Sequence, residues 1–245
     1  MKKNRKAQVT LFVIIAIMLI AAVAVVISQR EAIGLFKKKA VGIEIMPIGA
    51  YVENCIKSTG ADALVLIGQQ GGYFELPSYA IDSRAYFYYE GKNIMPTKAE
   101  IEREIAKYID KELSPCTGDF TDFPDFSIKS KDVRTKAIIL EGKVRLLVRY
   151  PLTITKGDST YSMSQFTVEI PSRLYTLYAI SESVVEDQFD TPQGICLGCL
   201  AKSSIENDLY FNLEDPEEDV IIFKITDKKV MLENKPYEFV FANKF

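Results

Sequence analysis

Four cysteines are the residues of this chain with the clearest capacity for chemistry. Two of them form the motif Cys196-Leu-Gly-Cys199, whereas Cys55 and Cys116 stand alone. Two cysteines separated by two residues can form a local structural disulfide, exchange disulfides with another molecule or help to hold zinc. A four-cysteine zinc site normally uses two close pairs, so the isolated positions of Cys55 and Cys116 argue against it. Structural disulfides are the first expectation, and free thiols in a cytoplasmic domain are the remaining alternative.

The even number of cysteines favours two disulfides if the domain lies outside the cell. Cys55 falls on the apolar face of a helix predicted over residues 47–70, and Cys116 ends a second helix that begins at Pro96. A bond between these two cysteines would join the helices, and its long loop would contribute roughly 4 kcal/mol of stability in the chain-entropy model. The close pair would then bond locally or act together.

Composition excludes several classes of function. The chain contains no histidine, which removes Ser-His-Asp and Cys-His catalysis, HExxH metal sites and the ordinary histidine-containing zinc sites. The formal net charge is -3, so no electrostatic argument favours nucleic acid as a partner. We therefore expect no catalytic residue, no metal and no cofactor.

Two further motifs have structural explanations. The glycine-rich stretch over residues 68–73 lacks the Lys-Ser/Thr of a phosphate loop and follows a helix, which indicates helix termination. The acidic stretch over residues 214–219 lacks the ligand spacing and the turn glycine of a calcium loop. We expect a solvated turn there.

An uncharged stretch over residues 8–28 predicts a transmembrane helix, because at about 1.5 Å per residue it covers the ~30 Å core of a bilayer. A cleaved secretory signal has a shorter apolar core, and a buried helix of a globular domain would show a polar stripe. Residues 1–7 are then a basic leader, residues 29–46 a juxtamembrane connector, and residues 47–245 an extracytoplasmic domain. The chain is expected to be a single-pass protein of the cell membrane.

The junction Arg5-Lys6-Ala7-Gln8, followed directly by the apolar run, resembles the type IV pilin-like (class III) signal of archaea. In that family a short basic leader is cut just before a glutamine that begins the hydrophobic helix. The resemblance implies cleavage between Ala7 and Gln8 by a prepilin-type peptidase, an outward-facing C-terminal domain and packing of the helix into a filament core. The chain as a whole is similar to single-span surface proteins of small-genome archaea, a likeness that implies no activity.

The chain departs from the pilin pattern in two ways. Phe12 occupies the fifth position after the implied cut, where pilins of this type carry a glutamate that neutralises a neighbour's amino terminus. Gly34, Gly42 and Pro47 interrupt the helix, which in pilins continues into the head domain. A single-span anchor with a pilin-like targeting segment therefore fits better than a pilin. Orientation depends on the resemblance, because basic residues flank the span almost equally on both sides.

The rest of the sequence predicts an α+β domain in which helices cover one side of a mainly antiparallel sheet. Thr97 and Glu100 form a capping box at the start of the second helix, and the aromatic stretch over residues 84–90 predicts a buried strand. Further helices are expected over residues 171–188 and from Cys196 to about Glu206. The other expected strands cover residues 137–140, 143–150, 152–156, 161–170, 208–213, 220–226 and 229–241, with a turn near Asp227-Lys228.

These observations favour a membrane-anchored extracytoplasmic protein with a structural or interactive role, and not an enzyme. The expected partners are the lipid bilayer and either other membrane or surface proteins or further copies of the chain. The alternative hypothesis is a membrane-tethered thiol-disulfide oxidoreductase that uses Cys196 and Cys199.

Overall fold

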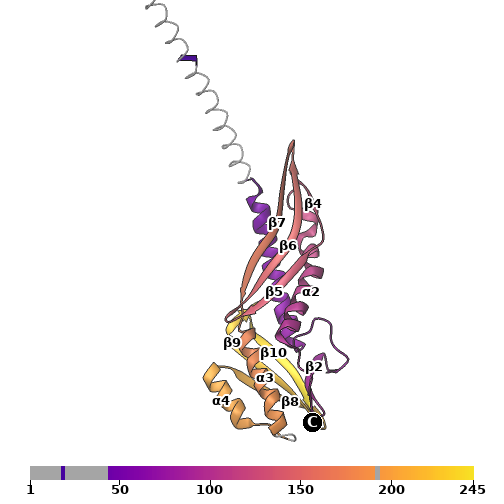
Figure 1. Ribbon diagram of the computed structural model, residues 1–245, viewed down its shortest axis with the longest axis vertical. Helices are drawn as coiled ribbons and strands as arrows, with labels where there is room; N and C mark the ends of the chain where they lie inside the picture. Colours follow the sequence, from indigo (N-terminus) through magenta and orange to yellow (C-terminus); the bar gives the residue numbers. More distant parts are fainter. Residues whose placement is uncertain (1–17, 20–43, 191–193) are drawn as a thin grey trace, which may run out of the picture. The chain divides into compact units, whose positions relative to one another are not determined.

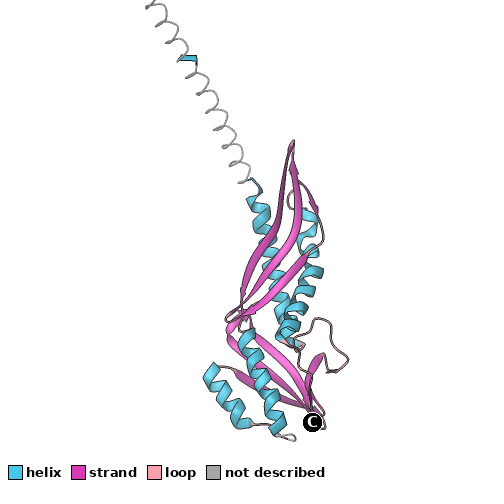
Figure 2. Ribbon diagram, viewed as in Figure 1, coloured by secondary structure: helices cyan, strands magenta, loops and turns pink. Residues whose placement is uncertain are grey.

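The computed structural model describes residues 18–19, 44–190 and 194–245 (Figure 1). The chain divides into two units, Met1–Ala50 and Tyr51–Phe245. The described strands belong to the second unit, which is an α+β domain (Figure 2).

The prediction of a transmembrane helix as part of the fold is wrong. In the part of the chain that the structure describes, no helix is long and apolar enough to cross a membrane. The expected span over residues 8–28 lies outside the described residues except at Met18 and Leu19. The described helices pair an apolar face with a charged one, which suits packing on a sheet.

Other features expected near the N-terminus also lie outside the described residues. They are the basic leader over residues 1–7, the cleavage site at Ala7 and Gln8, and residues 29–43 of the connector. These remain predictions from the sequence.

The described helices are one over residues 44–69, α2 (Lys98–Thr117), α3 (Leu174–Asp190) and α4 (Leu197–Asn207), and a short 3-10 turn, η1 (Gly118–Phe120), follows α2. The apolar face predicted for the first of these is confirmed within the second unit. Its buried residues there include Val52, Cys55, Ile56, Thr59, Ala63 and Ile67.

The capping box at the start of α2 is confirmed. The Glu100 amide donates to Thr97 Oγ1 at 3.3 Å, and the Thr97 amide donates to the Glu100 carboxylate at 2.7 Å. These bonds to Thr97 hold the pKa of Glu100 below its ordinary value. The helix continues through Pro115 to Thr117, one residue beyond the expected end at Cys116, and is capped by Gly118, whose φ of 51° is left-handed.

The first sheet joins segments from both ends of the domain. Its order is β1-β2-β10-β9-β8, with β3 also paired to β2. The C-terminal strand β10 runs parallel to β2, whereas the other pairs are antiparallel. The strands are β1 (Ala80–Ile81), β2 (Arg84–Tyr89), β3 (Lys92–Asn93), β8 (Tyr210–Glu217), β9 (Val220–Leu232) and β10 (Lys235–Lys244).

The second sheet is built around one long strand. It contains β4 (Ser127–Ser130), β5 (Arg134–Leu140), β6 (Lys143–Lys156) and β7 (Ser159–Pro171). One edge of β6 pairs with β7, and the other edge pairs first with β5 and then with β4. The sequence predicted one sheet with β6 divided in two, and the structure shows two sheets with β6 continuous.

The second sheet is covered on one face only. Val144, Leu146 and Val148 of β6 are buried, whereas Leu147 and Arg149, which alternate with them, are exposed. In Figures 1 and 2 two helices, the one that ends at residue 69 and α2, lie along one side of this sheet. No described helix covers its other face.

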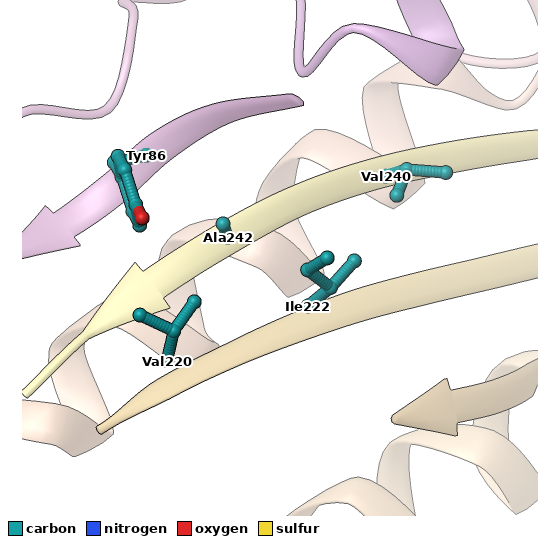
Figure 3. Packing of buried hydrophobic residues seen from close by; sticks show 5 residues of the cluster. All are labelled: Tyr86, Val220, Ile222, Val240 and Ala242. Atoms are coloured by element: carbon teal, nitrogen blue, oxygen red, sulfur yellow. The ribbon is translucent and has the colours of Figure 1, made fainter. Parts of the chain in front are cut away.

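Both faces of the first sheet contain apolar side chains. On one face the rings of Phe87 and Phe223 stack on Phe241, with centroid distances of 4.4 and 5.1 Å. The other face carries the cluster in Figure 3, which consists of Tyr86, Val220, Ile222, Val240 and Ala242. The predicted buried aromatic strand is confirmed as β2, whose four central residues are buried.

Glycines let the helix over residues 44–69 approach both sheets. A Cβ at Gly60 would lie 2.5 Å from Ile170 Cδ1 and 2.7 Å from Leu146 Cδ1 in the second sheet. A Cβ at Gly68 would overlap the backbone oxygen of Glu238 in the first sheet. The helix therefore packs at two glycines that are two turns apart.

The hairpin between β9 and β10 corrects a predicted turn. We expected the turn near Asp227-Lys228, but β9 continues to Leu232 and the turn is at Glu233 and Asn234, whose φ values are 50° and 63°. Asp227 stays within the strand because its buried carboxylate accepts from Arg173 at 3.1 Å and from the Lys229 amide at 2.9 Å.

Replacing Gly68 by alanine should destabilise the domain by about 1–3 kcal/mol, because the new methyl meets a backbone atom that cannot move without shifting β10. Gly198→Ala is the matched control: a Cβ there has open space, and alanine should change stability by no more than about 1 kcal/mol. Urea unfolding midpoints measure both. Equal effects of the two substitutions would contradict the close packing at Gly68.

Candidate functional site

The close cysteine pair forms a disulfide at the start of α4. Cys196 is the residue that caps the helix, its Sγ accepts from the Cys199 amide at 3.2 Å, and the two Cα atoms are 5.2 Å apart. Both cysteines are half-buried, while Leu197 between them is 66% exposed. The disulfide therefore lies near the surface of the domain.

Helix α3 places two polar side chains beside this disulfide. An oxygen of the Asp187 carboxylate and the two sulfurs lie within 4.8 Å of one another. Gln188 is only 1% exposed, lines the same small space as Asp187 and Cys196, and leaves its Oε1 without a hydrogen-bond partner. Neither residue was predicted from the sequence as part of a site, although Asp187 stands nine positions before Cys196.

These side chains could ligate a metal only after reduction of the disulfide. Zinc binds cysteine as thiolate, and both sulfurs are here bonded to each other. The reduced pair and Asp187 would offer three ligands. The expectation that the protein holds no metal remains a prediction.

A groove of about 680 Å³ adjoins the cysteine motif. Ile195 and Leu197, which flank Cys196 in sequence, line it together with Phe245 at the end of the chain. Its other described residues are Gly194, Asp215, Asp219, Val220 and Ile221. An extended apolar segment could lie in this groove next to the disulfide.

The second disulfide is structural. Cys55 and Cys116 are bonded with a Cα separation of 5.8 Å, and Cys55 is only 6% exposed. The bond ties the helix over residues 44–69 to the end of α2, where Thr117 Oγ1 lies 3.2 Å from the hydroxyl of Tyr150. The predicted pairing is thus the one in the structure, and the cysteines form two separate pairs rather than one four-cysteine site.

Two disulfides indicate an oxidising, extracytoplasmic environment, since cytosolic reductants keep most thiols reduced. This supports the coarser part of the predicted localisation.

A pair of carboxyl groups forms a second titratable cluster. Burial raises the pKa of Asp62 to about 6, and a hydrogen bond to Glu233 and its negative charge add to the effect. Glu233 belongs to the turn between β9 and β10, so the pair joins the helix over residues 44–69 to the first sheet. The protonated Asp62 carboxyl group can donate a hydrogen bond to Glu233, so this contact is strongest when Asp62 is protonated.

The outer face of the second sheet is basic. Arg134 and Lys136 of β5 and Arg149 of β6 are exposed and form no ion pair within 4.0 Å of another described residue, although the charge of Arg134 acts on the Asp110 carboxyl group. Lys143 and Arg145 both bind one carboxylate, that of Glu169, at 2.7 and 2.8 Å. We call Arg134, Lys136 and Arg149 the basic face.

The hairpin between β8 and β9 has the opposite charge. Its carboxylates are all exposed and form no ion pair among the described residues: Glu214, Asp215, Glu217, Glu218 and Asp219. We call these five residues the acidic hairpin. Much of the segment predicted as a solvated turn is strand, because β8 extends to Glu217.

Comparison with known proteins gives no relative from which a function could be transferred. No protein-family model, curated protein or solved structure matches the chain. The function is therefore inferred from the residues and contacts of the chain itself.

Replacing Cys55 and Cys116 together by serine should lower the free energy of unfolding by about 4 kcal/mol, because the lost bond spans 61 positions. The matched control, Cys196→Ser with Cys199→Ser, opens a loop of only 3 positions and should cost about 2 kcal/mol in the same model. Denaturant unfolding of the non-reduced proteins measures the difference. If the control variant loses as much free energy of unfolding as the first variant, the Cys55–Cys116 bond is not the main covalent constraint.

Replacing Asp62 by asparagine should stabilise the protein at neutral pH, since the amide can donate to Glu233 at a pH at which the Asp62 carboxyl group has lost its proton. The folded-state pKa of Asp62 is raised from 3.8 to about 6, so its favourable contribution is complete below the unfolded value and is lost as pH rises through about 6. The difference in stability between variant and parent should therefore grow from about pH 4 to about pH 7. Thermal unfolding across this range measures it, with Asp158→Asn as control; a constant difference would contradict the raised pKa of Asp62.

Proposed function

We propose that the protein is an extracytoplasmic structural or interaction protein that binds its partner through the basic face. The observation that carries the proposal is the unpaired positive charge on the open side of the second sheet. Arg134 lies directly opposite Arg149 in the register of β5 and β6. Like charges at directly opposed positions destabilise a sheet, and an anionic partner would relieve this repulsion.

The face also offers an apolar contact at its centre. Leu147 pairs directly with Lys136 and is 38% exposed, and Thr167 of β7 lies on its other side. An exposed leucine surrounded by unpaired cations is a suitable centre for a protein interface. The basic residues would set the orientation of the partner and the rate of association.

The partner that we propose is a second copy of the chain. The acidic hairpin supplies five exposed carboxylates, and it belongs to the first sheet, whereas the basic face belongs to the second. The two patches are different surfaces, so their contact would be heterologous rather than two-fold symmetric. Contacts of this kind repeat and produce rings or open filaments.

Self-association of the full-length protein should therefore depend strongly on salt. Raising ionic strength from about 0.1 M to about 1 M shortens the Debye length from about 10 Å to about 3 Å, which should dissociate the complexes. Neutralising the basic face, with Arg134→Gln and Lys136→Gln, should abolish assembly at low salt, and so should Glu217→Gln with Glu218→Gln. Sedimentation velocity measures the size of the particles.

A mixture of the two neutralised proteins distinguishes a heterologous contact from a general charge effect. Each variant keeps one intact patch, so the mixture should form dimers and nothing larger. Lys57→Gln with Lys92→Gln removes the same charge outside the basic face and should assemble like the parent. Salt-independent assembly, or loss of assembly in this control, would contradict the proposed contact.

A further inference from the structure

We propose that the Cys196–Cys199 disulfide is redox-active and oxidises dithiols in extended polypeptides, with Asp187 as a positioning residue beside it. The argument for this activity does not rest on the proposed self-association, although Asp215 and Asp219 belong to both surfaces. It departs from the expectation of a non-enzyme and develops the alternative that the sequence allowed.

The two disulfides of the domain differ in the way that this proposal requires. Cys55 is 6% exposed and its bond connects two helices across 61 positions. The bond of Cys196 lies near the surface, spans 3 positions and has the exposed Leu197 within its loop. Access of an attacking thiolate is a condition for exchange. Both cysteines of the local bond are half-buried, whereas in the other bond Cys116 is half-buried and Cys55 is buried.

The surroundings of the local disulfide favour its reduced form. The Asp187 carboxylate presents an oxygen atom to a pair of sulfurs that carry no hydrogen to donate. Gln188 lines the same small space as Asp187 and Cys196, and its buried Oε1 has no donor, which is costly. Reduction creates an S–H group that can donate to the Asp187 carboxylate. A pair whose reduced form is stabilised is a stronger oxidant.

The hydrogen bond at the start of α4 distinguishes the two sulfurs. The Cys199 amide donates to Cys196 Sγ at 3.2 Å, and an amide at a helix N-terminus stabilises a thiolate. Cys196 is therefore the better leaving sulfur in the last step, which makes it the sulfur that forms the mixed disulfide. Cys199 is the sulfur that is released first and takes a proton.

The reaction transfers two electrons and one proton from the substrate to the protein, and the second proton of the substrate dithiol goes to solvent. A substrate thiolate attacks Cys196 Sγ, the bond to Cys199 breaks, and a substrate–Cys196 disulfide forms while Cys199 is protonated. The second substrate thiol, as thiolate, then attacks the substrate sulfur of the mixed disulfide. The substrate leaves as a disulfide, and Cys196 leaves as a thiolate that the Cys199 amide stabilises.

The adjoining groove suggests the class of substrate. Ile195, Leu197 and Phe245 line it with apolar surface, and Asp215 and Asp219 add negative charge. A polypeptide with apolar residues and lysines around its two cysteines would match these features. A folded protein with buried cysteines would not enter.

The first experiment is redox titration of the full-length protein in dithiothreitol buffers of defined ratio, with alkylation and mass spectrometry of each cysteine. Cys196 and Cys199 should become reduced under conditions in which Cys55 and Cys116 remain bonded, so the second disulfide is an internal control for the fold. Reduction of all four cysteines together would overturn the proposal.

Substitution of Asp187 tests the positioning role. Asp187→Asn should shift the equilibrium of the pair towards the disulfide by about five- to tenfold, the worth of one hydrogen bond near a charge. It should also change the pH profile of the exchange rate. Glu186→Gln, the exposed neighbour on α3, should change neither quantity. If both variants have the same equilibrium and the same pH profile, Asp187 has no positioning role.

Two further measurements test the chemistry and the substrate class. Cys199→Ser should accumulate a mixed disulfide between Cys196 and an oxidised test peptide, because the second cysteine is missing. The parent protein should oxidise a leucine-rich dithiol peptide with flanking lysines faster than the same peptide with flanking glutamates. No trapped complex and equal slow rates for both peptides would show that the disulfide is only structural, whatever the outcome of the self-association experiment.

Discussion

Close packing of one helix against both sheets is the contact on which the rest of the domain depends. Gly60 brings the helix over residues 44–69 onto β6 and β7, and Gly68 brings it onto β10 two turns later. The Cys55–Cys116 bond then ties this helix to α2, which lies beside it. Sheets that share few contacts of their own are joined because one rigid helix spans both.

This arrangement leaves two surfaces without internal partners. The helices cover one face of the second sheet, so its cations face outward, and the acidic hairpin projects from the first sheet. Structure and charge therefore divide the domain into a basic and an acidic part despite its small net charge of -3. Asp215 and Asp219 of the hairpin also line the groove beside Cys196, so an assembled neighbour would lie close to the redox pair.

Local features were predictable from the sequence, and features that depend on distant residues were not. The capping box at Thr97 involves neighbours in the chain, and the aromatic strand at residues 84–90 is apolar whatever it pairs with. Nothing local indicates that β10 pairs with β2, since the two are about 150 positions apart. The prediction of a turn near Asp227 was wrong because Arg173, which is distant in sequence, stabilises that aspartate inside a strand. The role of Asp187 depends on where α3 ends relative to α4, and the transmembrane helix was inferred from hydropathy alone.

The domain is oxidised as two separate disulfides, one structural and one near the surface. Disulfide mapping is the decisive measurement: thiols of the full-length protein are blocked at lysis, and peptides are identified by mass spectrometry without reduction. We expect Cys55 to be linked only to Cys116 and Cys196 to be linked only to Cys199. Blocked thiols at Cys55 or Cys116, or a link between the two pairs, would contradict it.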